Sequence, residues 1–358
     1  MKALKLRKRN RFLFAGAAVT AVAMAVAGLA APALARPSAP AAQAGTTAQG
    51  PGYPPPKGIY KPFTNCPLNN PLMHETIDAL ACVAGLATSG SITLGNITTQ
   101  VTEPVNVQFG FGFTPNDDNY PAPAFPPLAG PSAILKTKPD LIPESLTTAL
   151  SCDTATDATI QNICQQAQAK GGIYNQVWAL AQEAGELRNF QLFNWTQPIK
   201  FKLINPLLGS NCYIGTDSDP VVVNPSLSVG PGGGLFIEND PRIDIHPDTG
   251  VLGINGAIAS DNTFSAPGVL GCGPGGVSNV AVDEALNTSS GLPAASGNSL
   301  TLNGSFLLGI STGGSDSTLT QPQDQASNLL AAFQASTNNE HSVKHRITMK
   351  QFKNKLHK

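Results

Sequence analysis

The chain has 358 residues, of which 13% are charged, and it carries a formal net charge of −1. With 35 glycines and 30 prolines, this composition predicts short strands joined by tight turns rather than long solvated helices. The body of the chain has no excess of basic residues, which argues against a nucleic-acid-binding core.

Residues 1–35 predict a secretory signal peptide. Basic residues crowd positions 2–11, an apolar segment covers residues 12–31, and Ala33-Leu34-Ala35 supplies the small residues that signal peptidase recognises. An uncleaved membrane anchor is the alternative, because the apolar segment is almost long enough to span a bilayer. Its many alanines and the cleavage triplet favour removal. We therefore expect a secreted, extracellular mature chain that could associate with the cell envelope.

Three further regions follow from composition. Residues 36–62 are rich in Pro, Ala, Gly and Gln, and we expect an extended linker there, because such a sequence buries no core. The β-rich secreted domain is expected over residues 63–337. Residues 338–358 form a basic tail with little to bury, which we expect to be disordered. The tail could bind anionic envelope polymers, and a solvated extension without a partner is the alternative.

Six cysteines lie in the mature part of the chain. An even number in an exported protein predicts three disulfides, although six cysteines allow fifteen pairings. The chain has no C-x-x-C pair, which argues against zinc. Pairing each cysteine with its nearest neighbour gives Cys66–Cys82, Cys152–Cys164 and Cys212–Cys272.

The first half of the domain predicts strands and one helix. Apolar and polar residues alternate over Ser91–Phe113, which indicates paired strands. Ser145–Gln168 is the best helical segment, and Gly171-Gly172 ends it. Ile173–Ala184 fits either a helix or a strand, because its apolar residues match both periods.

The second half is more clearly β-structure. Residues 199–203 alternate apolar side chains with two lysines, as in a half-buried strand. Asn303-Gly304 is interpreted as a break between two strands. The predicted strands cover residues 199–203, 221–223, 242–246, 251–258 and 299–310, and a short helix covers 324–334. This spacing predicts a mainly β fold, an antiparallel sandwich or open barrel with one or two short helices, stapled by disulfides.

Four segments resemble a family of exported actinobacterial proteins that are described as secreted proteins of unknown function. Residues 205–215 (NPLLGSNCYIG) and 266–273 (APGVLGCG) are the most specific, and residues 63–67 and 291–298 are the others. The resemblance covers about residues 60 to 310 and leaves out the basic tail. It implies export, disulfides and a β-rich fold, and it assigns no catalytic residue.

Two glycine motifs could carry chemistry. Gly309–Gly313 matches the G-x-S-x-G motif, in which a strained strand-to-helix turn exposes the serine of a hydrolase. A poor helix start follows it, and the available histidines, such as His341 and His345, lie in the tail, so a turn that closes a hairpin is the simpler interpretation. Gly271–Gly276 matches G-x-G-x-x-G, but Pro274 lacks an amide and the residues that follow look like a strand. We expect no dinucleotide site.

Asp244, His246 and Asp248 are weak candidates for metal ligands. Asp244 and His246 would share one face of a strand, and Asp248 would enter the adjoining turn. The solvent face of a hairpin explains these residues more simply. We therefore predict neither a metal site nor a cofactor.

Four aromatic residues could line a ligand groove, although aromatics near alternating strands usually belong to the core. They are Trp178, Phe190, Phe193 and Trp195. With no assembled nucleophile or metal set in the sequence, we expect a non-enzymatic structural or binding module of the cell envelope or extracellular space. The alternative is a secreted hydrolase whose site forms only in three dimensions.

Overall fold

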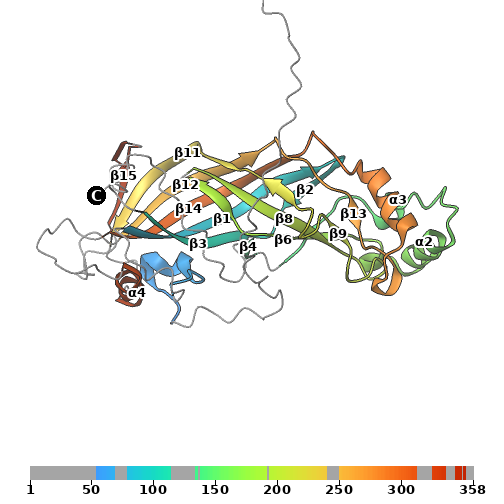
Figure 1. The fold of residues 1–358 in the computed structure, drawn as a ribbon, viewed down its shortest axis with the longest axis horizontal. Coiled ribbons are helices and arrows are strands. Elements are labelled where there is room, and N and C mark those ends of the chain that lie inside the picture. The colour runs from blue at the N-terminus through green and yellow to red at the C-terminus, as the bar shows by residue number, and fades with distance from the viewer. Residues whose placement is uncertain are drawn as a thin grey trace, which may run out of the picture. The chain divides into compact units, whose positions relative to one another are not determined.

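One large antiparallel β-sheet dominates the fold, with its long strands side by side (Figure 1). The computed structural model describes residues 54–68, 79–113, 134–135, 138–191, 193–239, 250–312, 325–335, 343–348 and 350–351. All of them belong to one compact unit, residues 48–358. The strands are β1 (Ala79–Leu94), β2 (Ile97–Val101), β3 (Val105–Phe113), β4 (Ile134–Leu135), β5 (Asp140–Leu141), β6 (Trp178–Glu183), β7 (Arg188–Gln191), β8 (Asn194–Ile204), β9 (Tyr213–Ile214), β10 (Val221–Val223), β11 (Ser226–Asn239), β12 (Gly250–Asp261), β13 (Val269–Leu270), β14 (Ser299–Thr312) and β15 (Val343–Ile347).

The sheet has two parts that meet at β8. Its main path runs β13-β9-β8-β11-β12-β14-β1-β3-β4, and the strand pairs are antiparallel. Strand β11 meets β8 where Ser226 lies opposite Asn194. We call β1–β4, β11, β12, β14 and β15 the long-strand half, and β5, β6, β8–β10 and β13 the β8 half. The predicted fold class, mainly β, antiparallel and disulfide-stapled, is confirmed.

Register places apolar residues together inside the long-strand half. Leu252 and Ile254 of β12 lie opposite Leu308 and Phe306 of β14, and all four are buried. Directly opposed residues point to the same face of a sheet, so these pairs form one continuous apolar surface. This surface is the face turned toward the β8 half.

The opposite face of the long strands is covered by a 3-10 helix, η1 (Gly58–Phe63), and by α4 (Gln325–Ala335). Tyr60 and Phe63 pack on Phe333, with ring centroids 5.0 and 5.7 Å apart. The expected linker, residues 36–62, is therefore wrong at its end, because Ile59 and Tyr60 are buried in the fold. The buried side chains of Ile59, Tyr60 and Phe63 anchor this segment in the core.

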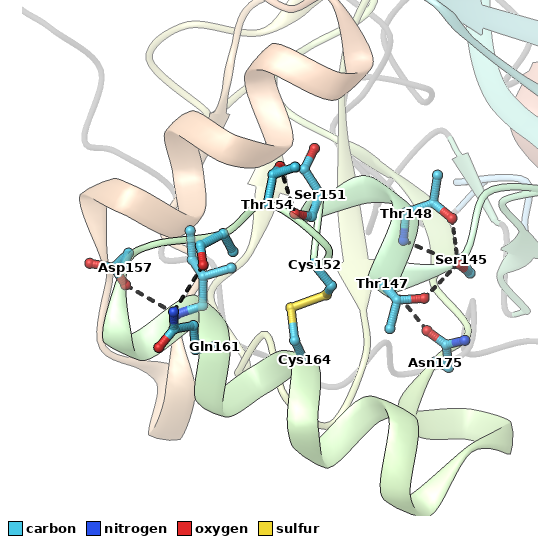
Figure 2. Close-up of a disulfide and its surroundings, with 12 residues drawn as sticks. Ser145, Thr147, Thr148, Ser151, Cys152, Thr154, Asp157, Gln161, Cys164 and Asn175 are labelled. Carbon is cyan, nitrogen blue, oxygen red and sulfur yellow. Dashed lines mark hydrogen bonds between the residues drawn. A yellow bond between two sulfur atoms is a disulfide. The ribbon is translucent and has the colours of Figure 1, made fainter.

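Three helices gather at the other end of the sheet: α1 (Leu146–Ala149), α2 (Ala158–Lys170) and α3 (Val280–Ser290) (Figure 1). The single helix expected over residues 145–168 is divided into α1 and α2, which Cys152–Cys164 joins (Figure 2). Asp157 caps α2 by accepting hydrogen bonds from the amides of Thr159 and Ile160 at 2.8 and 3.0 Å. With α4, the described residues hold four α-helices instead of the expected one or two.

All three predicted disulfides are confirmed. Cys66–Cys82, Cys152–Cys164 and Cys212–Cys272 join cysteines 16, 12 and 60 positions apart in the chain. Such bonds are typical of proteins outside the cytoplasm. Among the described residues, no helix is both long and apolar enough to cross a membrane.

The expected break at Asn303-Gly304 is wrong, because β14 continues through it. Gly304 lies against β1 where the pairing shifts between Ala87 and Ser89, and a Cβ on it would overlap the carbonyl of Leu86. The glycine therefore permits close contact between strands at a bulge rather than a turn.

The basic tail is also partly ordered. Strand β15 pairs with β11, so that Ile347 lies opposite Leu235 and Lys344 opposite Glu238. Charge alone predicted disorder, but the apolar residues Val343 and Ile347 alternate with the basic ones as an edge strand requires.

Candidate functional site

An apolar cavity lies between the two halves of the sheet. Its walls come from β1, β2, β3 and β14 of the long-strand half and from β5, β6, β8, β9 and β10 of the β8 half. Of the twenty residues that line it, twelve are Ile, Leu or Val, and Thr99, Asp140 and Gln197 are polar. Both halves therefore contribute an aliphatic surface to one shared space.

The cavity is large enough for a small ligand. The centre of a water molecule can move through about 90 Å³ of it. All of the space between its walls, including the open mouth, amounts to about 940 Å³. Sugars, nucleotides and peptides need many polar partners when they leave water, and an aliphatic wall offers few. The chemistry of the walls therefore favours an apolar ligand.

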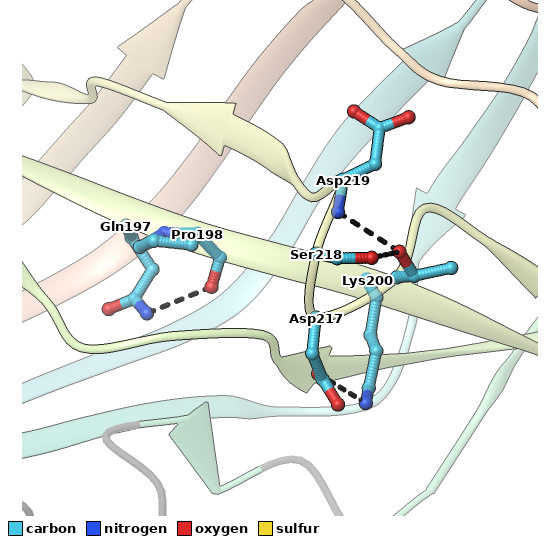
Figure 3. A network of polar contacts seen from close by, with 7 residues as sticks. Gln197, Pro198, Lys200, Asp217, Ser218 and Asp219 are labelled. Atoms are coloured by element: carbon cyan, nitrogen blue, oxygen red, sulfur yellow. Dashed lines mark hydrogen bonds and ion pairs between the residues drawn. The ribbon is translucent and has the colours of Figure 1, made fainter. Parts of the chain in front are cut away.

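Strand β8 supplies one side of the cavity. Successive side chains of a strand point to opposite faces, so one set of β8 residues shares the cavity wall: Trp195, Gln197, Ile199 and Phe201. Lys200 lies on the other face, where its ammonium is 2.6 Å from Asp217 (Figure 3). Across the β8–β10 pair, Val223 lies opposite Gln197 and also lines the cavity.

Gln197 combines burial with an unpaired acceptor. The residue is 3% exposed, and its Nε2 donates to the carbonyl of Pro198 at 3.2 Å (Figure 3) and to that of Gly185 at 3.4 Å. Its Oε1 is buried and has no hydrogen-bond partner among the described residues. Buried side-chain acceptors in proteins usually have a partner, so an acceptor without one is an unusual feature of this wall.

Asp140, the charged residue in the wall, serves the fold. Its Oδ1 accepts hydrogen bonds from the Thr102 amide at 3.0 Å, the Thr102 hydroxyl at 3.1 Å and the Glu103 amide at 3.2 Å. These bonds tie the turn between β2 and β3 to β5. The carboxylate therefore fixes the position of the two sheet halves at the cavity.

Trp195 belongs to two neighbouring apolar spaces. Besides the cavity, it lines a smaller hollow between β1, β3, β12 and β14. The centre of a water molecule can move through about 50 Å³ of this hollow. Val105, Val107 and Leu302 line both spaces as well. The apolar surface therefore continues past Trp195 along the long strands.

Comparison with models of protein families, with curated proteins and with solved structures found no match to this chain. A proposal for the function therefore depends on the geometry of the cavity. The resemblance to exported actinobacterial proteins stays a prediction.

Of the four aromatic residues proposed for a groove, Trp195 lines the cavity. Phe190 is core, since its ring meets that of Phe109 edge-on at a centroid distance of 4.9 Å. Phe193 packs against the same core cluster, and Trp178 lies one residue from the lining residue Ala179, on the opposite face of β6.

The sequence prediction missed Gln197 and Asp140. The expected strand began at residue 199, whereas β8 begins at Asn194. If the alternation is extended back to Trp195, Gln197 falls at a position of the strand where an apolar residue is expected. This exception to the alternation is the sequence feature that could have indicated Gln197. Nothing in the local sequence of Asp140 indicated its burial.

Ser311 of the G-x-S-x-G motif is fully buried in the middle of the sheet, where it lies opposite Leu80 of β1. It belongs to β14 rather than to the expected turn. His345 belongs to β15, which is separated from β14 by β11 and β12. Three strand spacings amount to about 14 Å along the sheet, so the backbone does not bring these two residues together. His341 lies outside the described residues.

The Gly271–Gly276 loop is held by a carboxylate. Helix α3, and not the expected strand, follows it, and Asp283 in the first turn accepts from the amides of Gly271 and Cys272 at 3.1 and 2.8 Å. Asp283 thus occupies the amides that a phosphate would need. The loop is a structural anchor.

The candidate metal ligands Asp244, His246 and Asp248 lie outside the described residues. Within the part of the chain that the structure describes, no group of three or more His, Cys, Asp or Glu side chains could hold a metal ion.

Lys344 and Arg346 line another hollow beside β11. The Lys344 ammonium lies 3.6 Å from the ring centroid of Phe236 and 3.8 Å from Glu238 Oε2. Its charge is therefore already engaged within the sheet, which weakens the case for an anion site there.

Proposed function

We propose that this chain is a secreted, non-enzymatic binding module that holds a lipid-type ligand with an aliphatic chain in the cavity between its sheet halves. It would act in the extracellular space or at the cell envelope. The observation that carries the proposal is the wall, in which Ile, Leu and Val make up twelve of twenty lining residues. Burial of apolar surface contributes about 25 cal/mol per Å², so an aliphatic chain along these walls supplies its own binding free energy.

Export is supported by three independent features. Residues 1–35 have the order of charge, apolar core and small residues that a secretory signal needs. The three disulfides are typical of oxidising compartments. The resemblance of residues 205–215 and 266–273 to exported actinobacterial proteins points the same way.

The test is ligand binding by the purified mature protein. Native mass spectrometry of protein from culture medium should detect a bound lipid, and delipidated protein should bind a fluorescent fatty-acid analogue. Ala181→Phe fills the cavity from β6 and should weaken binding at least about tenfold. Gln182→Phe adds the same ring on the opposite face of β6 and should leave binding unchanged.

Two results would overturn the proposal. One is the absence of binding of any aliphatic probe by folded, delipidated protein. The other is turnover of an ester, glycan or peptide substrate that Ser311→Ala abolishes, which would establish the hydrolase instead.

A further inference from the structure

We infer that the ligand of the cavity is a hydroxylated lipid, whose hydroxyl donates a hydrogen bond to Oε1 of Gln197. This inference rests on the proposed function and specifies the chemical class of its ligand. An aliphatic chain would lie along the Ile, Leu and Val side chains, and a fatty alcohol or a hydroxylated acyl chain would place its polar group at β8.

The orientation of the Gln197 amide is set by its neighbours. Nε2 faces two backbone carbonyls, those of Pro198 at 3.2 Å and Gly185 at 3.4 Å. A flipped amide would place its oxygen against the same two carbonyl oxygens and lose both hydrogen bonds. Oε1 is therefore the acceptor without a partner, and the proposed ligand hydroxyl would reach it from the cavity that Gln197 lines.

Other polar groups of the cavity do not compete for this role. Asp140 Oδ1 already accepts three hydrogen bonds from Thr102 and Glu103. Thr99 lies on β2, in the facing half of the sheet. A water molecule needs two to four polar partners to be held in a buried site, and the aliphatic side chains around Gln197, such as Ile199 and Val223, provide none.

The energetic consequence is selectivity between ligands of equal length. A ligand without a donor leaves this buried acceptor unsatisfied, whereas a hydroxyl that donates to it removes that cost in exchange for its own hydrogen bonds to water. A difference of 1.4 kcal/mol corresponds to a factor of ten in affinity. We therefore expect an alcohol to bind about tenfold more tightly than an analogue that has the oxygen but no donor.

The experiment compares 1-dodecanol with dodecyl methyl ether and 1-dodecanethiol, each displacing the fluorescent fatty-acid analogue from full-length mature protein. The wild type should prefer the alcohol over the ether about tenfold, and the thiol, a weak donor, should behave like the ether. Gln197→Met keeps the length of the side chain without its amide and should bind alcohol and ether equally. Gln182→Met makes the same change on the face of β6 away from the cavity and should keep the preference.

The outcomes separate this inference from the proposed function. If the wild type binds ether and alcohol equally well, or if Gln197→Met keeps the preference, the cavity still binds lipids but the role of Gln197 is wrong. If neither compound binds, both ideas are wrong. The wild-type comparison needs no variant, so it decides the question even if Gln197→Met fails to fold.

Discussion

The indole of Trp195 stacks on the ring of Phe306, with their centroids 6.5 Å apart and their planes 20° from parallel. This contact joins β8 to β14, strands that belong to different halves of the sheet. Trp195 lines the cavity and the smaller hollow beside it. A ligand that enters either space therefore changes the surroundings of this indole.

The first prediction uses Trp195 as a reporter. The chain has two tryptophans, Trp178 and Trp195, and the first lies on the face of β6 away from the cavity. Trp178→Phe should keep the change in tryptophan emission when 1-dodecanol is added, because Trp195 remains. Trp195→Phe should lose the change. A response that follows Trp178 instead would place the ligand elsewhere.

The second prediction concerns two of the disulfides, Cys212–Cys272 and Cys152–Cys164. In the chain-entropy model, removing Cys212–Cys272 should lower the free energy of unfolding by about 4 kcal/mol, and removing Cys152–Cys164 by about 3 kcal/mol, because the first closes a loop of 60 positions and the second one of 12. Urea denaturation of the paired Cys→Ala variants measures both. Cys212 lies two residues before the lining residue Ile214. Removing Cys212–Cys272 should therefore also weaken ligand binding, whereas removing Cys152–Cys164 should not.

Local patterns predicted much of this fold. The lysines of residues 199–203 revealed an alternating strand, and its apolar residues Ile199 and Phe201 do line the cavity. An even number of cysteines, each paired with its nearest neighbour, gave the three correct pairs. In each case the signal lies within one segment, or needs only proximity along the chain.

The cavity could not be predicted in the same way. Its walls combine β1–β3 with β8, which begins about a hundred positions later in the sequence, and no period within either segment reveals the other. Gln197 is recognisable as special only once its neighbours are known to be aliphatic. The strand break predicted at Gly304 was wrong for a similar reason, because the contact of this glycine with Leu86 lies across two strands rather than along the chain.

The third prediction is a pH dependence at Glu144. Burial raises the pKa of this carboxyl above its ordinary value. The folded protein then binds the proton more tightly than the unfolded chain, so the ionised side chain lowers stability above the folded-state pKa, and this penalty disappears as the pH falls below the unfolded value.

Glu144→Gln should therefore be slightly more stable than the wild type at pH 7, by less than about 0.5 kcal/mol for a half-buried side chain. The two proteins should become equally stable below about pH 4. Thermal unfolding across this range measures the difference. A variant that is less stable than the wild type at pH 7 would contradict the assigned cause.

The fourth prediction is that Asp283 anchors the loop that carries Cys272. Its carboxylate accepts hydrogen bonds from the amides of Gly271 and Cys272 and from the Ser278 hydroxyl. Asp283→Ala leaves these donors without their acceptor and should lower the free energy of unfolding by about 2–3 kcal/mol. Glu284→Ala removes an exposed carboxylate from the next position of α3 and should change stability by less than about 0.5 kcal/mol. Equal urea midpoints for the two variants would show that the anchor contributes nothing beyond its charge.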